Sequence, residues 1–291
     1  MMNRRFFGKL MAGAVVVGSS GSRRLMGQAA VEGGLVASQF SVMMWTLNSH
    51  GTFEENLARV AEAGYRNVEL VGEFRKWSDA DWKRILARMK TLGIKVDSVA
   101  GMKVGFADPG DTYLTELKNL VAINERLECK QIILVSGKRV EGAAEGSQHQ
   151  TCIDTLKQAA EVLKPAGMVA VIEPIDRLEN PPIYLDGVTE AFEIVRAVGS
   201  PNVKVLYDLY HEQRTHGNLI EKLEKNLDEV ALIHIADVPG RHEPGTGEVD
   251  YKNVYRKLKE LKYKGMIAME FYPTGDVVAT LRKAQEEAMG A

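Results

Sequence analysis

The sequence predicts a single-domain α/β protein of the (β/α)8 class, the TIM barrel. From Gln39 onward, short apolar segments alternate with amphipathic segments, and the pair recurs eight times. The apolar segments are rich in Val, Ile and aromatic residues and nearly continuous in hydrophobicity, which is typical of strands buried on both faces of a parallel sheet. Eight such pairs in succession are the pattern of a closed barrel in which each strand is followed by a helix.

Each apolar segment has the length of a strand, and the segments between them carry apolar residues at helical spacing. The predicted strands are 40–45, 67–71, 95–101, 131–137, 168–175, 203–211, 230–238 and 265–273. The predicted helices are 52–64, 79–93, 112–128, 149–167, 184–199, 218–229, 251–262 and 277–290.

The first two predicted helices illustrate how their faces and ends are recognised. Phe53, Leu57 and Val60 share one face of the first helix, as expected for a helix that packs on a sheet. Asp79 is suited to capping the N-terminus of the second helix, and Gly93 is suited to ending it. The competing fold, a doubly wound open sheet, is disfavoured because no glycine-rich phosphate-binding turn follows the first predicted strand.

The composition is that of an ordinary globular protein, with 45% hydrophobic and 26% charged residues among 291. A formal net charge of -2 argues against a nucleic-acid-binding surface, which needs clustered positive charge. No linker or low-complexity segment divides the chain, so one domain is expected. Cys129 and Cys152 should lie near opposite ends of the barrel, too far apart for a disulfide, and both are expected to be free thiols.

Residues 1–30 differ from the rest and predict a twin-arginine-type signal peptide ahead of a barrel domain at 31–291. Arg4 and Arg5 lie in a positively charged N-terminal region, and a short apolar stretch follows it. Small residues that end at Ala30 provide a candidate cleavage site. The apolar stretch is too short to span about 30 Å of hydrocarbon as a helix. The mature protein is therefore expected to be periplasmic or secreted and free of the membrane, with an uncleaved anchor or a frayed basic terminus as the alternative.

Four predicted strands in a row each carry one polar side chain late in an otherwise apolar run. These side chains are Glu173, Asp208, His234 and Glu270. In a barrel the carboxyl ends of the strands meet on one face, where active sites form, so the four side chains should converge. Buried carboxylates are costly unless they are paired or bound to a metal. Three carboxylates and an imidazole suit Mn²⁺, Mg²⁺ or Co²⁺, although each residue taken singly has the alternative of a structural role.

Four segments carry a resemblance to a known family: IEPIDR, YDLYHEQ, HIADVPGRHEPGTGEVDY and MEFYP. Together they resemble the hydroxypyruvate isomerase branch of the xylose-isomerase-like TIM barrels, over most of the mature chain, and PGRHEPGTGE is the most specific motif. The resemblance implies that one divalent metal is bound by Glu173, Asp208, His234 and Glu270. It also implies that Glu173 and Glu270 flank the substrate carbon that loses and regains a proton.

Two features depart from that branch. Hydroxypyruvate isomerases usually carry glutamine where this chain has His234, whereas ketose 3-epimerases carry histidine. Arg177 and Glu179, in the stretch EPIDRLE, also resemble the epimerases. These departures weaken the assignment of the substrate but not the assignment of the chemistry.

Four further residues are expected to bind the substrate. The resemblance implies that His211 faces a substrate oxygen, and Glu179 stands in the stretch shared with the epimerases. Arg241 follows the seventh predicted strand, where its guanidinium could clamp a carboxylate, with an ion pair to a glutamate of its own loop as the alternative. Glu69 lies late in the second predicted strand and is expected to point to the same face.

These observations predict a metal-dependent isomerase that interconverts an α-hydroxy ketone and an aldehyde through an enediolate, most similar to hydroxypyruvate isomerase. The substrate would be hydroxypyruvate or a small related sugar, with no nucleic-acid partner, and a homo-oligomer is left open. The first alternative is a ketose 3-epimerase or another sugar epimerase of the same fold. A metal-dependent hydrolase or lyase and a non-catalytic sugar-binding barrel are the alternatives from other classes.

Overall fold

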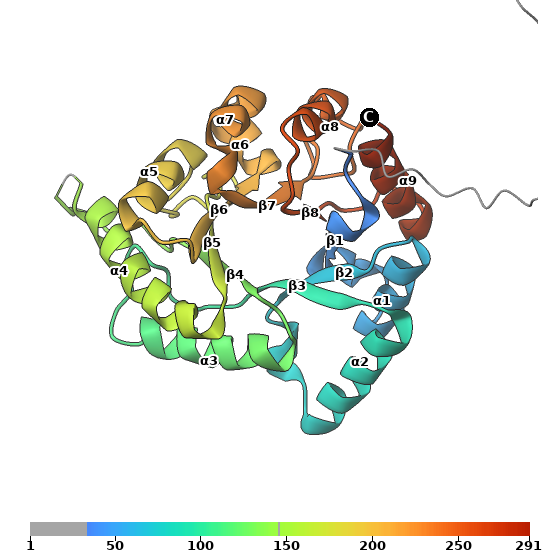
Figure 1. The fold of residues 1–291 in the computed structure, drawn as a ribbon, viewed down its shortest axis with the longest axis horizontal. Helices are drawn as coiled ribbons and strands as arrows, with labels where there is room; N and C mark the ends of the chain where they lie inside the picture. Colours follow the sequence, from blue (N-terminus) through green and yellow to red (C-terminus); the bar gives the residue numbers. More distant parts are fainter. Residues whose placement is uncertain (1–33, 145) are drawn as a thin grey trace, which may run out of the picture. The chain divides into compact units, whose positions relative to one another are not determined.

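The computed structural model describes residues 34–291 except residue 145, and it confirms the predicted barrel. Eight parallel strands pair in sequence order, and β8 closes the ring on β1 (Figure 1). The strands are β1 (Phe40–Met43), β2 (Asn67–Val71), β3 (Lys95–Ala100), β4 (Gln131–Val135), β5 (Val169–Glu173), β6 (Val203–Asp208), β7 (Val230–Ile235) and β8 (Met266–Met269). The predicted signal peptide at 1–30 lies outside the described residues and stays a prediction.

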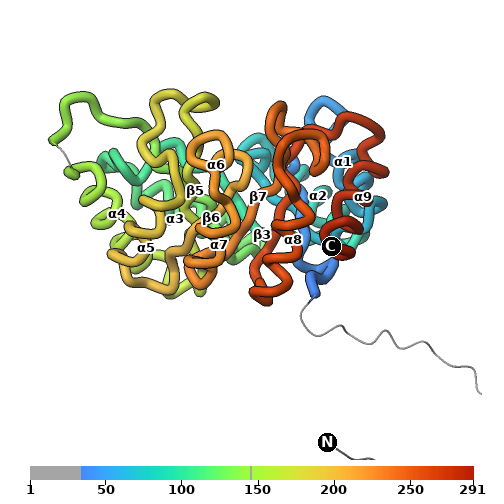
Figure 2. Tube along the Cα trace, turned by 90° about the horizontal axis from the view of Figure 1, so that it is seen from above, coloured from blue at the N-terminus to red at the C-terminus, as the bar shows by residue number. Residues whose placement is uncertain are grey.

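The α-helices form a ring around the strands, as Figures 1 and 2 show from two directions. They are α1 (Phe53–Glu62), α2 (Asp79–Leu92), α3 (Tyr113–Arg126), α4 (Ser147–Leu163), α5 (Val188–Val198), α6 (Leu209–Thr215), α7 (Leu219–Asn226), α8 (Tyr251–Glu260) and α9 (Val277–Gly290). The short 3-10 helices are η1 (Ala37–Gln39), η2 (Met44–His50), η3 (Glu73–Lys76), η4 (Lys164–Ala166) and η5 (Leu227–Glu229). Within 34–291, no helix has the length and apolar character needed to cross a membrane.

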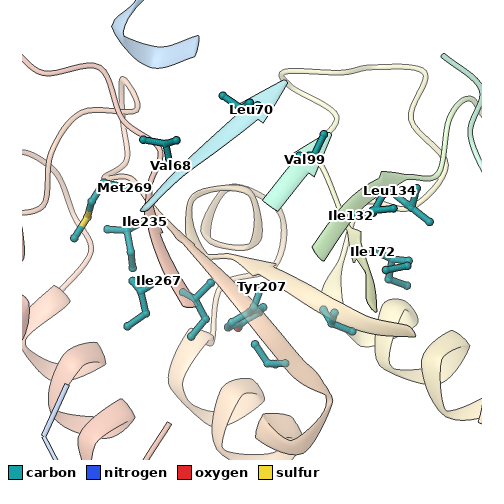
Figure 3. Close-up of a cluster of buried hydrophobic side chains, with 14 of the residues drawn as sticks. Val68, Leu70, Val99, Ile132, Leu134, Ile172, Tyr207, Ile235, Ile267 and Met269 are labelled. Carbon is teal, nitrogen blue, oxygen red and sulfur yellow. The ribbon is translucent and has the colours of Figure 1, made fainter. Parts of the chain in front are cut away.

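Two apolar clusters stabilise the barrel, because successive side chains of a strand point to opposite faces. The larger cluster lies between the strands and the surrounding helices, where Val68, Leu70 and Tyr207 are buried (Figure 3). Cys129 and Cys152 belong to it as free thiols, as the sequence predicts. The smaller cluster contains one residue from each of six strands: Met43, Ile133, Val171, Leu206, Leu232 and Ala268.

Several predicted boundaries are wrong; the strand predicted at 265–273 ends at Met269, for example, and the helix predicted at 184–199 begins at Val188. The strand predicted at 203–211 ends at Asp208, because the Asp208 carboxylate accepts the N–H groups of Tyr210 and His211 and so begins α6. The strand predicted at 40–45 ends two residues early, in η2. The N-cap of α2 is Ser78 rather than Asp79, since the Ser78 hydroxyl accepts the N–H of residue 81.

One buried carboxylate holds the loop that follows β7. Asp237 is fully buried, and its two oxygens accept backbone N–H groups from four loop residues: Val238, Gly245, Gly247 and Val249. Residue 247 must be glycine, because a Cβ there would lie 2.0 Å from the carbonyl oxygen of Val238. The same loop carries Arg241, which accordingly has a fixed position beside the ends of the strands.

Replacing Asp237 by alanine would leave four backbone N–H groups without their acceptor. We expect the free energy of unfolding to fall by about 2–4 kcal/mol, because an unsatisfied buried donor costs about 1–3 kcal/mol and water replaces part of the loss. Urea denaturation followed by circular dichroism measures this change. Asp237→Asn keeps one oxygen and should lose less stability, and equal stability of all three proteins would contradict the role given to this carboxylate.

Candidate active site

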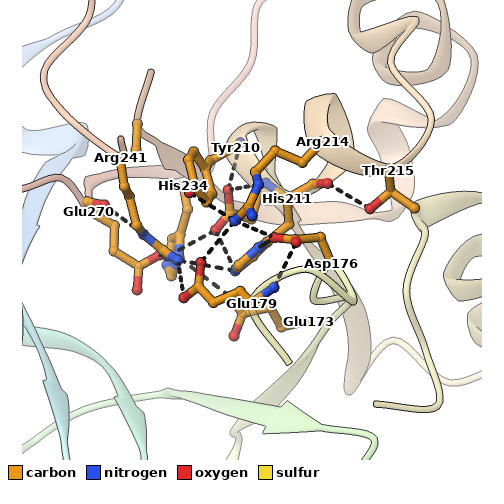
Figure 4. Close-up of polar contacts among 12 residues, drawn as sticks. Glu173, Asp176, Glu179, Tyr210, His211, Arg214, Thr215, His234, Arg241 and Glu270 are labelled. Carbon is orange, nitrogen blue, oxygen red and sulfur yellow. Dashed lines mark hydrogen bonds and ion pairs between the residues drawn. The ribbon is translucent and has the colours of Figure 1, made fainter. Parts of the chain in front are cut away.

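The four polar side chains predicted at the ends of neighbouring strands converge at one point. Glu173 and Asp208 are the last residues of β5 and β6, His234 lies in β7, and Glu270 follows β8 directly. Each offers one nitrogen or oxygen atom that lies within 4.8 Å of the atoms offered by the other three. All four side chains are buried, and Figure 4 shows three of them, Glu173, His234 and Glu270, pointing toward one another. The barrel brings them together because parallel strands end on one rim.

The His234 imidazole uses its two nitrogens in opposite directions. Its Nδ1 lies 2.6 Å from Oε2 of Glu270 and 3.9 Å from Oε1 of Glu173. Its Nε2 lies 3.0 Å from Oε2 of Glu69, on β2. Nδ1 therefore faces the group of carboxylates, and Nε2 faces away from it.

Arg241 reaches into the same group from the loop after β7. Its Nη2 lies 2.6 Å from Oε2 of Glu270 and 3.3 Å from Oδ2 of Asp208. Its Nη1 lies 2.9 Å from Oε1 of Glu179, and its Nε donates to the backbone carbonyl of Glu270. The alternative of an ion pair with Glu243 or Glu248 of its own loop is therefore wrong: the carboxylate of Glu243 accepts from Thr274, and that of Glu248 accepts from Gln213.

His211 and Glu179 lie at the same mouth as Arg241. The Nδ1 atom of His211 lies 2.7 Å from Oδ2 of Asp176, and its Nε2 lies 3.4 Å from Oδ2 of Asp208. Arg214 contacts the opposite side of Asp176, with Nη1 3.1 Å from the same Oδ2. Sequence reasoning missed Asp176 and Arg214, although Asp176 lies in the quoted segment IEPIDR and Arg214 directly follows the segment YDLYHEQ.

Glu69 contacts the site from inside the barrel rather than from the open cavity. It is fully buried, its Oε1 accepts the hydroxyl of Ser98 at 2.6 Å, and its Oε2 faces His234. It does not line the cavity at the mouth of the barrel. These contacts favour an interaction with His234 over the predicted contact with a substrate.

A cavity of about 340 Å³ opens above the four side chains and has two unlike walls. Its polar wall consists of Glu173, Glu179, Asn180, His211, Arg241 and Glu270, and its apolar wall of Met43, Trp45, Val71, Ala100, Ile133, Val135 and Ile175. Trp45 joins the two, because its indole N–H donates to Oε1 of Glu270 at 3.1 Å and its ring packs edge-on against Tyr272. One end of a small molecule can thus meet charged groups while the rest lies against an apolar surface.

A larger cavity, of about 690 Å³, lies elsewhere, between the loop after β7, α8 and α9. It is lined by none of the predicted site residues. Volume alone does not mark the reactive site, whereas the cavity above β5 to β8 combines enclosure with converging acids and bases.

The electrostatic environment separates the two glutamates of the site. Burial and the neighbouring charge of Glu270 raise the pKa of Glu173 to about 7. Burial also acts to raise the pKa of Glu270, but the charges of Arg241 and His234 outweigh it and hold that pKa well below its usual range. Near neutral pH Glu270 is therefore ionised while Glu173 can hold a proton, a difference suited to acid–base chemistry.

The donor set fits a single divalent cation. Three carboxylates and the Nδ1 atom of an imidazole lie close enough to share one ion, and oxygen-rich sets of this kind suit Mn²⁺, Mg²⁺ or Co²⁺. A second acidic group at the mouth, Asp176 with Glu179 and His211, is equally compact. The guanidinium groups of Arg214 and Arg241 already balance the charge of that second group, so it has less need of a metal.

Comparison with known proteins identifies a matching family and several similar proteins. The family model described as "Xylose isomerase-like TIM barrel" matches residues 57–289. Hydroxypyruvate isomerase of Escherichia coli K12 is 29% identical over 251 residues, covering 84% of this chain and 97% of the relative. 2-Oxo-tetronate isomerase of Haemophilus influenzae is 28% identical over 253 residues, covering 84% and 96%. The crystal structure of an AP endonuclease of family 2 from Brucella melitensis superposes with a TM-score of 0.72 at 27% identity, covering 84% and 96%.

The family model covers the chain from α1 to the end of α9, and the two isomerases match it along nearly their whole length. The closed barrel of eight parallel strands agrees with that match. This protein belongs to the xylose isomerase-like TIM barrel family.

Proposed function

We propose that this chain, an isomerase by its relatives, interconverts an α-hydroxy ketone and an aldehyde through an enediolate, with hydroxypyruvate or a small related keto acid or sugar as substrate. The observation that carries the proposal is the convergence of two buried glutamates, Glu173 and Glu270, within a donor set that suits one divalent ion. Relatives named hydroxypyruvate isomerase and 2-oxo-tetronate isomerase support the same reaction class.

The chain's own residues would divide the proton transfer between them. A divalent ion bound by the four side chains would polarise the substrate carbonyl and stabilise the negative charge of the enediolate. Glu270, held ionised by Arg241, is suited to removing the proton next to the carbonyl. Glu173, the other glutamate of the set, would carry a proton to the neighbouring carbon. Acid–base catalysis of this kind contributes about 10²–10⁴-fold to a rate.

An epimerase remains the second candidate, and His234 is the observation that favours it, since the epimerases of this fold resemble this chain there. An epimerase returns the proton to the same carbon from the opposite face, so two carboxyls must flank that carbon, which Glu173 and Glu270 also allow. NMR analysis of the products separates the two reactions, because an isomerase moves the carbonyl and an epimerase inverts one centre.

Exchange of substrate protons with solvent tests the proposal directly. In D₂O with Mn²⁺, wild-type protein should incorporate deuterium into hydroxypyruvate or a small ketose, and a binding protein should incorporate none. Glu173→Gln and Glu270→Gln should each lower turnover by about 10²–10⁴-fold, because each removes one proton carrier. The exposed Glu248→Gln is the matched control and should keep the wild-type rate. Near-wild-type rates from either site variant would remove both glutamates from the mechanism.

Arg241→Ala should shift the pH dependence of kcat/KM. The guanidinium holds the pKa of Glu270 low, so its loss lets that pKa rise. On acidification, kcat/KM of the variant should therefore begin to fall at a higher pH than that of the wild type. Glu179→Gln removes another of the carboxylates that Arg241 contacts and should leave this acidic limb in place. An unchanged limb in Arg241→Ala would show that the arginine does not control the base.

We also propose that residues 1–30 direct export of the folded enzyme, as their paired arginines suggest. Replacing Arg4 and Arg5 together by lysine should retain the protein in the cytoplasm of a bacterial host, because twin-arginine signals depend on that pair. Cell fractionation with immunoblotting measures the distribution. Unchanged export of the double variant would contradict the twin-arginine assignment.

A further inference from the structure

We propose that Glu69 is a positioning residue that orients His234 toward the metal through the imidazole nitrogen that does not bind it. This inference rests on the proposed metal site and goes beyond it, because Glu69 belongs to neither the four converging side chains nor the cavity lining. It also replaces the expectation that Glu69 contacts the substrate.

The geometry brings two atoms together inside the barrel, with the carboxylate of Asp97 nearby. Oε2 of Glu69 lies 3.0 Å from Nε2 of His234. Both residues are fully buried, and within 34–291 neither atom has a hydrogen-bonding partner, so the close contact between them is the only polar contact either makes. The other oxygen of the carboxylate, Oε1, accepts the Ser98 hydroxyl at 2.6 Å. A continuous row of contacts thus runs from Ser98 on β3 through Glu69 on β2 to His234 on β7.

The position of Glu69 follows from an irregularity in the sheet. The pairing of β2 with β3 shifts by one residue after Val68, so that Val68 pairs with Val96 while Glu69 pairs with Ser98. The bulge places the Ser98 hydroxyl beside the Glu69 carboxylate, and bulges commonly redirect side chains next to active sites. With Oε1 held by Ser98, the second oxygen is fixed opposite His234.

A neutral imidazole carries a proton on one nitrogen and a lone pair on the other. A carboxylate at Nε2 would hold the proton there, so that Nδ1, which faces Glu270 and Glu173, would give up its proton and offer its lone pair when an ion binds among the carboxylates. Histidine ligands of metals commonly have such a carboxylate partner, which fixes the ring and raises its basicity. Without Glu69 the ring could carry its proton on either nitrogen and rotate about its side-chain bonds.

Mn²⁺ affinity, measured from the EPR signal of the free ion, tests this role. Glu69→Gln keeps the size of the side chain but loses its charge, and Glu69→Ala loses both. We expect the dissociation constant for Mn²⁺ to rise by about 10–100-fold in Glu69→Ala and by less in Glu69→Gln. Glu212→Gln is the matched control, because it removes another buried carboxylate, one bound to Lys222 and the backbone of Val188, and should bind Mn²⁺ as the wild type does.

Nitrogen-15 NMR of histidine-labelled, Mg²⁺-loaded protein gives a readout that loss of packing alone would not produce. The wild type should show one His234 signal with the proton on Nε2, and Glu69→Ala should lose it. Ser98→Ala provides a milder variant that retains the carboxylate, should Glu69→Ala fail to fold, and is expected to weaken Mn²⁺ binding by a smaller factor.

Three results would overturn the inference. Wild-type Mn²⁺ affinity in folded Glu69→Gln and Glu69→Ala would remove the positioning role. A raised KM with unchanged Mn²⁺ affinity would make Glu69 a substrate ligand instead. A wild-type protein that binds no Mn²⁺ would remove the metal site and this role together. If the affinities follow the expected order but no substrate exchanges its proton, the positioning role holds and the proposed reaction fails.

Discussion

The structure depends on how the barrel compensates negative charge gathered in a buried space. Glu173, Asp208 and Glu270 place one carboxyl each within 4.8 Å of the others, where little water can screen their repulsion. Arg241 supplies opposite charge within contact distance of Glu270 and Asp208. The three carboxylates lie at or just beyond the ends of β5, β6 and β8, which direct them to one point, and Arg241 reaches them from the loop after β7. The fold therefore concentrates charge at the proposed site.

Several residues of the site also shape the backbone, which ties the chemistry to the fold. Asp208 offers one oxygen to the N-terminus of α6 and the other to Arg241, so a single carboxylate both begins a helix and enters the charge network. Asp237 holds the loop that carries Arg241, with all of its contacts to backbone N–H groups. A change at either position would affect both folding and the site. Within the described residues, the carboxylate of Glu173 accepts no backbone N–H group, so a change there should affect the site alone.

The sequence predicted the barrel and the four converging side chains because both follow from local patterns. Apolar runs of strand length mark the strands, and a polar residue at the end of such a run must lie at the rim. Contacts made across the barrel leave no such pattern. Glu69 was placed on the right strand, yet its partner lies on β7, which is not adjacent to β2. Asp176 and Arg214 were missed because their contact depends on folding: only the folded chain brings Asp176 close to His211 and Arg214 of α6.

The central claim is that the four side chains from β5 to β8 share one divalent ion. Anomalous diffraction at the manganese absorption edge, from crystals grown with Mn²⁺, tests it most directly. The account predicts one strong peak per chain among Glu173, Asp208, His234 and Glu270, with Nδ1 of His234 as the nitrogen ligand. A peak at Asp176 and Glu179 instead, or none in the barrel at saturating Mn²⁺, would contradict it.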